Sequence, residues 1–140
     1  MDREVVEQKL ESLRRCLQRL EDKCPTLPEI LAADLDLQDI IALNLSRAVQ
    51  ISVDIGAHLI TGMDAPPPGT MGQTFDILAK EGFLNNEVAT NLKKAVGFRN
   101  IAVHNYERIN WLIVHSIVKY HLIDFVQFAK LVTKKLDANS

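Results

Sequence analysis

The chain has 140 residues, of which 47% are hydrophobic and 24% charged, a composition typical of a folded domain and far from that of a disordered chain. This length fits one domain, so we expect residues 1–140 to form a single unit. The formal net charge of −2 argues against a broad basic surface, so any RNA would have to meet a local basic site, as a transient substrate.

The first element is predicted to be a helix from Glu4 to Asp22. Its apolar residues repeat at steps of four and three, which is typical of a bundle helix, whereas a coiled coil would need more heptads. This narrow seam consists of Val6, Leu10, Leu13, Leu17 and Leu20. The sequence leaves open whether the seam packs within the chain or against a second chain.

Several segments exclude other classes of protein. The N-terminus, MDREVVEQKLE, is charged from its second residue, unlike a signal peptide, and stretches such as INWLIVHSIV are too short to cross a bilayer. We therefore expect a soluble cytoplasmic protein with no membrane contact. Cys16 and Cys24 are too few for a disulfide framework and are expected to be reduced packing residues. The scattered His and Cys residues show no metal-ligand spacing, so neither a metal nor another cofactor is expected.

A long central helix is predicted after Pro25 and Pro28, which break the chain. It should run from Leu37 to Thr61, with Asp36 as its N-cap, and it is apolar on most sides. Its polar residues fall on one arc at helical spacing, which suits a solvated face as well as a functional one. They are Asn44, Arg47, Asp54 and His58.

The remaining elements also have helical patterns. A loop containing APPPG ends at Thr70, which forms a capping box with Gln73, and Gly82 is a suitable end for the short helix that follows. Asn85 or Asn86 should cap the next helix. The expected helices are 71–80, 86 to about 103, 109–119 and 122–136, with the last break near Tyr120 and His121. The prediction is an all-α, antiparallel bundle of about five to six helices.

Arg99 lies in the middle of the apolar stripe of helix 86–103. A guanidinium that faces protein is costly unless it is paired, because Arg does not deprotonate. Arg99 should therefore have a carboxylate partner, for which Asp54 and Glu107 are candidates, or lie at a cleft where an anion binds. The alternative is that its side chain reaches solvent.

His104 follows Arg99 by five residues and would point roughly 140° away on an ideal helix. The two side chains can share a site only if the helix ends near Val103 and the chain turns, or if two chains form the site together. Asn105, a residue that commonly ends helices, favours the first arrangement. A histidine at such a place can also be a purely structural hydrogen-bonding group.

The segment RNIAVHNY, from Arg99 to Tyr106, resembles the signature of HepT-like toxins of the HEPN superfamily: R-N, a short spacer, then H-x-Y. The flanking segments EGFLNNEVATNLKKAVGFRN, RAVQISVDIGAHLI and LIDFVQFAKLV, and the intervening proline loop, are similar to that family too. The resemblance covers the chain from Leu37 to its end.

The resemblance implies an endoribonuclease toxin that cleaves RNA without a metal ion, through attack of the ribose 2′-hydroxyl. His104 would be the general acid or base and Arg99 the phosphate clamp, as suits their chemistry. The family is usually homodimeric, with both motifs facing one cleft, and Gly97 would allow another backbone to approach closely. Asn100 and Asp54 would support the site.

The resemblance also implies a partner, a minimal nucleotidyltransferase (MntA-like) antitoxin. Such an antitoxin transfers AMP to the Tyr of the motif, so Tyr106 is the expected acceptor, and it could also position RNA. An alternative is a non-catalytic helical subunit that serves the nucleotidyltransferase, which the near-neutral charge favours. A plain helical adaptor would leave Arg99 unexplained. The sequence does not specify the RNA target, the cut site or the stoichiometry with the antitoxin.

Overall fold

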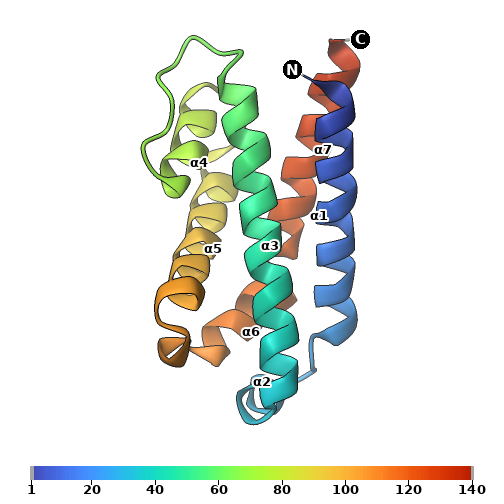
Figure 1. The fold of residues 1–140 in the computed structure, drawn as a ribbon, viewed down its shortest axis with the longest axis vertical. Coiled ribbons are helices and arrows are strands. Elements are labelled where there is room, and N and C mark those ends of the chain that lie inside the picture. The colour runs from blue at the N-terminus through green and yellow to red at the C-terminus, as the bar shows by residue number, and fades with distance from the viewer. Residues whose placement is uncertain (1, 140) are drawn as a thin grey trace.

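The computed structural model describes residues 2–139, which contain seven α-helices and no strand (Figure 1). In chain order the helices are α1 (Arg3–Lys23), α2 (Pro28–Ala33), α3 (Leu35–Ile60), α4 (Met71–Lys80), α5 (Asn86–His104), α6 (Trp111–Tyr120) and α7 (Leu122–Ala138). A 3₁₀ turn, η1 (Tyr106–Arg108), joins α5 to α6. The all-α bundle is thus confirmed, with slightly more helices than the five to six expected.

The additional helix is α2, which the sequence pattern did not predict. It has six residues, too few for an apolar repeat to be recognised, and Pro28 lies in its first turn, where no backbone N–H is needed. The start of α3 also differs from the expectation. Asp34 is its N-cap and accepts a hydrogen bond from the Leu37 backbone N–H at 3.0 Å, so the assignment of Asp36 was wrong.

The other predicted helix boundaries agree with the structure to within two residues, and the predicted end of α3, Thr61, lies one residue beyond the observed end at Ile60. Thr70 Oγ1 accepts from the Gln73 N–H at 3.2 Å, and Asn85 Oδ1 accepts from the Val88 N–H at 2.8 Å. Gly82 has a φ of 79°, the conformation that favours glycine after a helix. The break at His121 separates α6 and α7, which bend by 46°.

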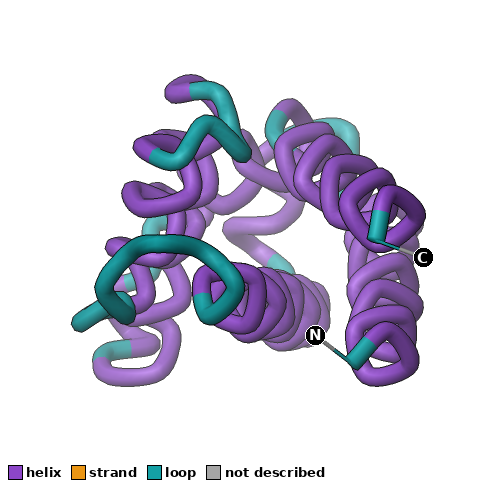
Figure 2. The backbone as a smooth tube through the Cα atoms, turned by 90° about the horizontal axis from the view of Figure 1, so that it is seen from above, coloured by secondary structure: helices purple, strands orange, loops and turns teal. Residues whose placement is uncertain are grey.

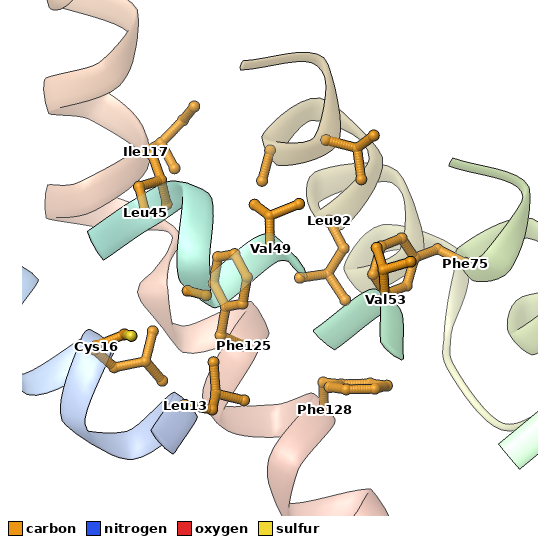
Figure 3. Packing of buried hydrophobic residues seen from close by; sticks show 14 of the residues in the cluster. Leu13, Cys16, Leu45, Val49, Val53, Phe75, Leu92, Ile117, Phe125 and Phe128 are labelled. Carbon is orange, nitrogen blue, oxygen red and sulfur yellow. The ribbon is translucent and has the colours of Figure 1, made fainter. Parts of the chain in front are cut away.

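Helix α3 lies between α1 and α5 and forms the centre of the bundle (Figures 1 and 2). Figure 3 shows Leu45, Val49 and Val53 of α3 among apolar side chains from the other helices. Phe128 of α7 also belongs to this core. The centre of its ring lies 6.1 Å from that of the Phe75 ring, and the two rings are edge-on. Such packing accounts for the nearly continuous apolar surface of α3.

The apolar seam of α1 packs within the chain. Val6, Leu13, Leu17 and Leu20 are buried in the same core as α3, which answers the question that the sequence left open. Cys16 is buried on this face, and Cys24 is half-buried; both are free thiols.

Helix α3 has the length and the mean hydropathy (1.2) of a membrane span. The sequence-based expectation considered only strongly apolar stretches such as INWLIVHSIV, which are too short to cross a bilayer, and it did not anticipate this match. However, 56% of the apolar window is buried by the rest of the bundle, and a core helix of a soluble protein passes the same test. The burial of α3 is therefore explained by packing within the chain.

The antiparallel course of α3 and α5 determines where the Arg99–Tyr106 segment lies. The start of α3 and the end of α5 reach the same end of the bundle, close to α2 and α6, while both chain termini lie at the opposite end (Figure 1). Residues near the start of α3 are thus brought to the motif although they precede it by about sixty positions in the chain.

Gly56→Ala is expected to lower the free energy of unfolding by about 1–3 kcal/mol, because overpacking a core strains it. A Cβ at Gly56 would lie 2.6 Å from Thr74 Cγ2 and 3.2 Å from Leu78 Cδ1. The matched control is Gly72→Ala in α4, whose Cβ would lie at an ordinary contact distance of 3.7 Å from Lys93 Cε and which should not lower the free energy of unfolding. Urea denaturation of both variants measures the difference, and equal stabilities would contradict the close approach of α4 to α3.

Candidate active site at the end of helix α5

Helix α5 continues through His104, one residue beyond the predicted end at Val103. Asn105 is its C-cap, and the Asn105 N–H donates to the Ile101 carbonyl at 2.8 Å. The chain turns only after this point, into η1. The early helix end that would let His104 swing towards Arg99 is therefore not formed.

Arg99 is half-buried on α5 and has no carboxylate partner among residues 2–139. Its only side-chain hydrogen bond there is from Nη1 to Asn100 Oδ1, at 3.3 Å. The expected ion pairs with Asp54 and Glu107 are absent from this set, so that part of the prediction was wrong. Asn100 is thus the one residue that orients the guanidinium, and most of the N–H donors of Arg99 remain available for an anion.

Asp54 interacts on another side of α3. Its carboxylate accepts from Gln50 Nε2 at 2.9 Å and lies 3.8 Å from Lys9 Nζ of α1. Since α1 and α5 flank α3 on different sides (Figure 1), the structure does not bring Asp54 to Arg99.

The polar residues of α3 that were predicted to share one arc do not form one solvated face. Asn44 is buried, and its side chain donates to the Ile40 carbonyl at 2.8 Å.

His104 is exposed on the last turn of α5. Because both residues are helical and five positions apart, the backbone directs His104 and Arg99 about 140° apart around the helix axis. Neither residue lines any of the five cavities described along residues 2–139. A single chain therefore supplies both groups but does not join them in one site.

Tyr106, the first residue of η1, is tied to the start of α3. Its Oη donates a hydrogen bond of 2.6 Å to Asp39 Oδ1, and its ring lies edge-on to Trp111 with 5.9 Å between ring centres. Burial and, after it, the Asp39 carboxylate raise the pKa of the Tyr106 phenol above its usual value. Tyr106 as a residue nevertheless remains 39% exposed, so part of it lies at the surface.

Asp39 is the residue that sequence reasoning missed. In the sequence it is one of several acidic residues near the start of the long central helix, and it precedes Tyr106 by 67 positions. No local spacing relates the two residues, because their contact depends on the antiparallel course of α3 and α5. Only the three-dimensional arrangement reveals the pair.

The segment around the motif is locally basic. From Lys93 to Arg108 the sequence has four Lys or Arg residues and one acidic residue, a formal charge of +3. One of these cations, Lys93, is paired with Asp76 at 3.0 Å. The chain as a whole has a net charge of −2, but this segment is basic, and a basic segment is suited to contact with the phosphate backbone of a nucleic acid.

Apolar side chains around the motif are exposed in the single chain. Ile101, Val103, Leu112 and Ile113 are between 44% and 57% exposed. Ile101 and Ile113 line a groove of about 490 Å³ between α5 and α6, as does Gly97. Clustered apolar surface of this kind marks contact with a partner. No part of residues 2–139 packs against Gly97, so nothing inside this region requires glycine there.

A family comparison bears on these residues. The family model described as ribonuclease HepT-like matches residues 6–132, which is most of the chain. The chain belongs to this HepT-like family.

Relatives agree with the assignment. The mRNA nuclease HepT of Shewanella oneidensis is 33% identical over 129 residues, covering 92% of this chain and 96% of the relative. A protein of Archaeoglobus fulgidus named as a putative RNase is 26% identical, over 88% of this chain and 96% of its own. Among solved structures, the tri-AMPylated Shewanella oneidensis HEPN toxin in complex with MNT antitoxin superimposes with a TM-score of 0.86 at 32% identity, covering 96% of this HepT-like chain and 99% of that one.

Asp39→Asn is expected to lower the pKa of the Tyr106 phenol, because the substitution removes the negative charge beside it. Ultraviolet titration of phenolate formation measures this, with Tyr106→Phe identifying the transition and Asp36→Asn as a charge-matched control on the same helix. The raised pKa also sets the sign of the stability effect. The stabilisation is present at neutral pH and is lost only as the pH rises through the folded-state pKa. An unchanged titration in Asp39→Asn would contradict the contact.

Proposed function

We propose that this HepT-like chain is the toxin of a toxin–antitoxin pair and an endoribonuclease that cleaves RNA without a metal ion. The observation that carries the proposal is the half-buried Arg99, whose guanidinium has Asn100 as its only side-chain partner among residues 2–139 and which shares α5 with the exposed His104. The names of the two relatives, an mRNA nuclease and a putative RNase, support the same activity.

The chemistry follows from the two residue types. Arg99 holds the scissile phosphate and stabilises the charge that builds on its oxygens, and Asn100 orients the guanidinium. His104 moves a proton, either from the ribose 2′-hydroxyl or to the leaving 5′-oxygen, in the manner of the histidines that serve as general acids and bases. The 2′-oxygen forms a bond to phosphorus while the bond to the 5′-oxygen breaks, which yields a 2′,3′-cyclic phosphate. DNA has no 2′-hydroxyl and is spared.

The working form is a homodimer in which the two motifs face one cleft. This arrangement removes the difficulty that Arg99 and His104 point apart within a chain, since the His104 of one chain can meet the Arg99 of the other. It also covers the exposed apolar groups Ile101 and Ile113 and uses the open surface at Gly97. Asp54, paired with Lys9, has no part in the proposed site.

The proposed partner is a minimal nucleotidyltransferase antitoxin that transfers AMP to Tyr106. The tri-AMPylated toxin in complex with MNT antitoxin, to which this chain is similar, supports this partner. Tyr106 lies partly at the surface, and a phosphate there would repel RNA and block the cleft. We place both reactions in the cytoplasm and in a single domain formed by the whole chain.

His104→Ala and Arg99→Ala are each expected to lower the rate of RNA cleavage by at least about 100-fold, because each removes a group that acts in the transition state. The assay uses highly purified protein with a chelator present and RNA and DNA as parallel substrates. Arg19→Ala, an exposed arginine on α1, is the charge-matched control. Full cleavage by both variants would contradict the mechanism, and no cleavage by the unmodified protein would favour the non-catalytic subunit.

A mixture of the two inactive variants is expected to regain activity that neither has alone. Subunit exchange makes heterodimers in which the Arg99 of one chain and the His104 of the other are both intact. Up to about half of the exchanged dimers would have this composition, so cleavage should rise well above that of either variant. A mixture that stays inactive after proven exchange would show that both groups must come from the same chain, against the arrangement on α5.

A further inference from the structure

The hydrogen bond from Tyr106 to Asp39 has a consequence for the modification of this tyrosine. The Tyr106 Oη, which would be the attacking atom in AMP transfer, already donates its proton to Asp39 Oδ1 across 2.6 Å. Asp39 is exposed and makes no other side-chain hydrogen bond or ion pair within residues 2–139. Its carboxylate therefore has no competing role in holding the bundle together.

The phenol is a poor nucleophile as long as it keeps its proton. Burial and the Asp39 charge raise its pKa, so the phenolate is disfavoured in the free chain at neutral pH. Attack on a phosphate must therefore be accompanied by removal of the proton. A base for this purpose must lie within hydrogen-bond reach of the oxygen, and among the described residues the one side chain in that position is Asp39.

We propose that Asp39 is the general base for AMP transfer to Tyr106, so that the chain supplies part of the catalytic machinery for its own modification. This inference rests on the proposed function, in which a nucleotidyltransferase antitoxin modifies Tyr106. The antitoxin supplies the bound nucleoside triphosphate, and the toxin supplies both the nucleophile and its base.

The Tyr106 oxygen forms a bond to the α-phosphorus of ATP, the bond from that phosphorus to the β-phosphate oxygen breaks, and pyrophosphate leaves. The phenol proton passes to the Asp39 carboxylate and then to solvent, which the exposure of Asp39 permits. The transfer becomes favourable during the reaction, because the oxygen loses its basicity as it becomes an ester oxygen.

The geometry distinguishes Asp39 from the other acidic groups near the start of α3. Asp34 is used as the N-cap and accepts from the Leu37 N–H. Asp36 lies in the first turn and has no hydrogen bond with Tyr106. Asp36→Asn therefore removes the same charge from the same helix without touching the phenol, and it serves as the matched control.

The experiment measures the rate of AMP addition by intact mass, with a purified minimal nucleotidyltransferase antitoxin and with ATP and magnesium, both at saturation. Asp39→Asn keeps an oxygen that can accept the phenol hydrogen bond but is not basic. It is expected to slow the first AMP addition by about 10²- to 10⁴-fold, the usual contribution of a general base. Asp39→Glu, which restores a carboxylate, should be faster than Asp39→Asn, and Asp36→Asn should match the unmodified sequence.

The outcomes separate this inference from the proposed function. If the unaltered chain gains no AMP, or if Tyr106→Phe gains it equally well, the proposed modification of Tyr106 fails and the role of Asp39 fails with it. If Tyr106 is modified but Asp39→Asn reacts at the full rate, only the role of Asp39 is overturned. The role of Asp39 is also overturned if Asp39→Glu is as slow as Asp39→Asn. It is likewise overturned if Asp39→Asn changes only the apparent affinity for the antitoxin and leaves the rate at saturation unchanged.

Discussion

The continuity of helix α5 through His104 is the constraint on which the rest of the site depends. A helix fixes the directions of its side chains, so Arg99 and His104 leave α5 on different sides and cannot adjust to each other by small rotations. The backbone gains freedom only after the cap at Asn105, where η1 carries Tyr106 back to Asp39 on α3. The motif is thus divided into two parts: a rigid helical part with Arg99 and His104, and a turn that presents the tyrosine. Under the proposed function, the rigid part requires a second chain and the turn serves the antitoxin.

The charges at this end of the bundle relate the two proposed reactions. The region from Lys93 to Arg108 is basic, whereas the start of α3 contributes Asp34, Asp36 and Asp39. In the unmodified chain the Tyr106 hydroxyl keeps its proton and donates a hydrogen bond to Asp39. It therefore adds no charge at the surface where RNA is proposed to bind. Transfer of AMP would break this hydrogen bond and place a phosphate charge beside the Asp39 carboxylate, which would repel it. The modified side chain would be driven away from α3, and the basic surface near Arg99 is the attractive place for its phosphate.

The sequence predicted those features that depend on local physics, and it failed where distant parts of the chain meet. The caps at Thr70 and Asn85 and the apolar pattern of α3 follow from residue types at short spacing, and the structure confirms them. Helix α2 has no such pattern, because six residues complete less than two turns. The position of Arg99 on an apolar stripe indicated burial but could not identify a partner, and the carboxylates chosen from sequence were wrong. The contact between Asp39 and Tyr106 spans 67 positions, which no local rule can relate.

The half-burial of Arg99 without an acidic partner among residues 2–139 is the structural basis of the proposed phosphate site. Arg99 is partly exposed and its hydrogen bond to Asn100 lies at the surface, so solvent or a bound anion can compensate its charge. A weak hydrogen bond of 3.3 Å to Asn100 orients the guanidinium but does not neutralise it. Departures from local stability rules of this kind are expected at functional sites, where the missing partner is the ligand. Under the proposed function the ligand is the phosphate of RNA, and the formal charge of +3 from Lys93 to Arg108 would attract such an anion.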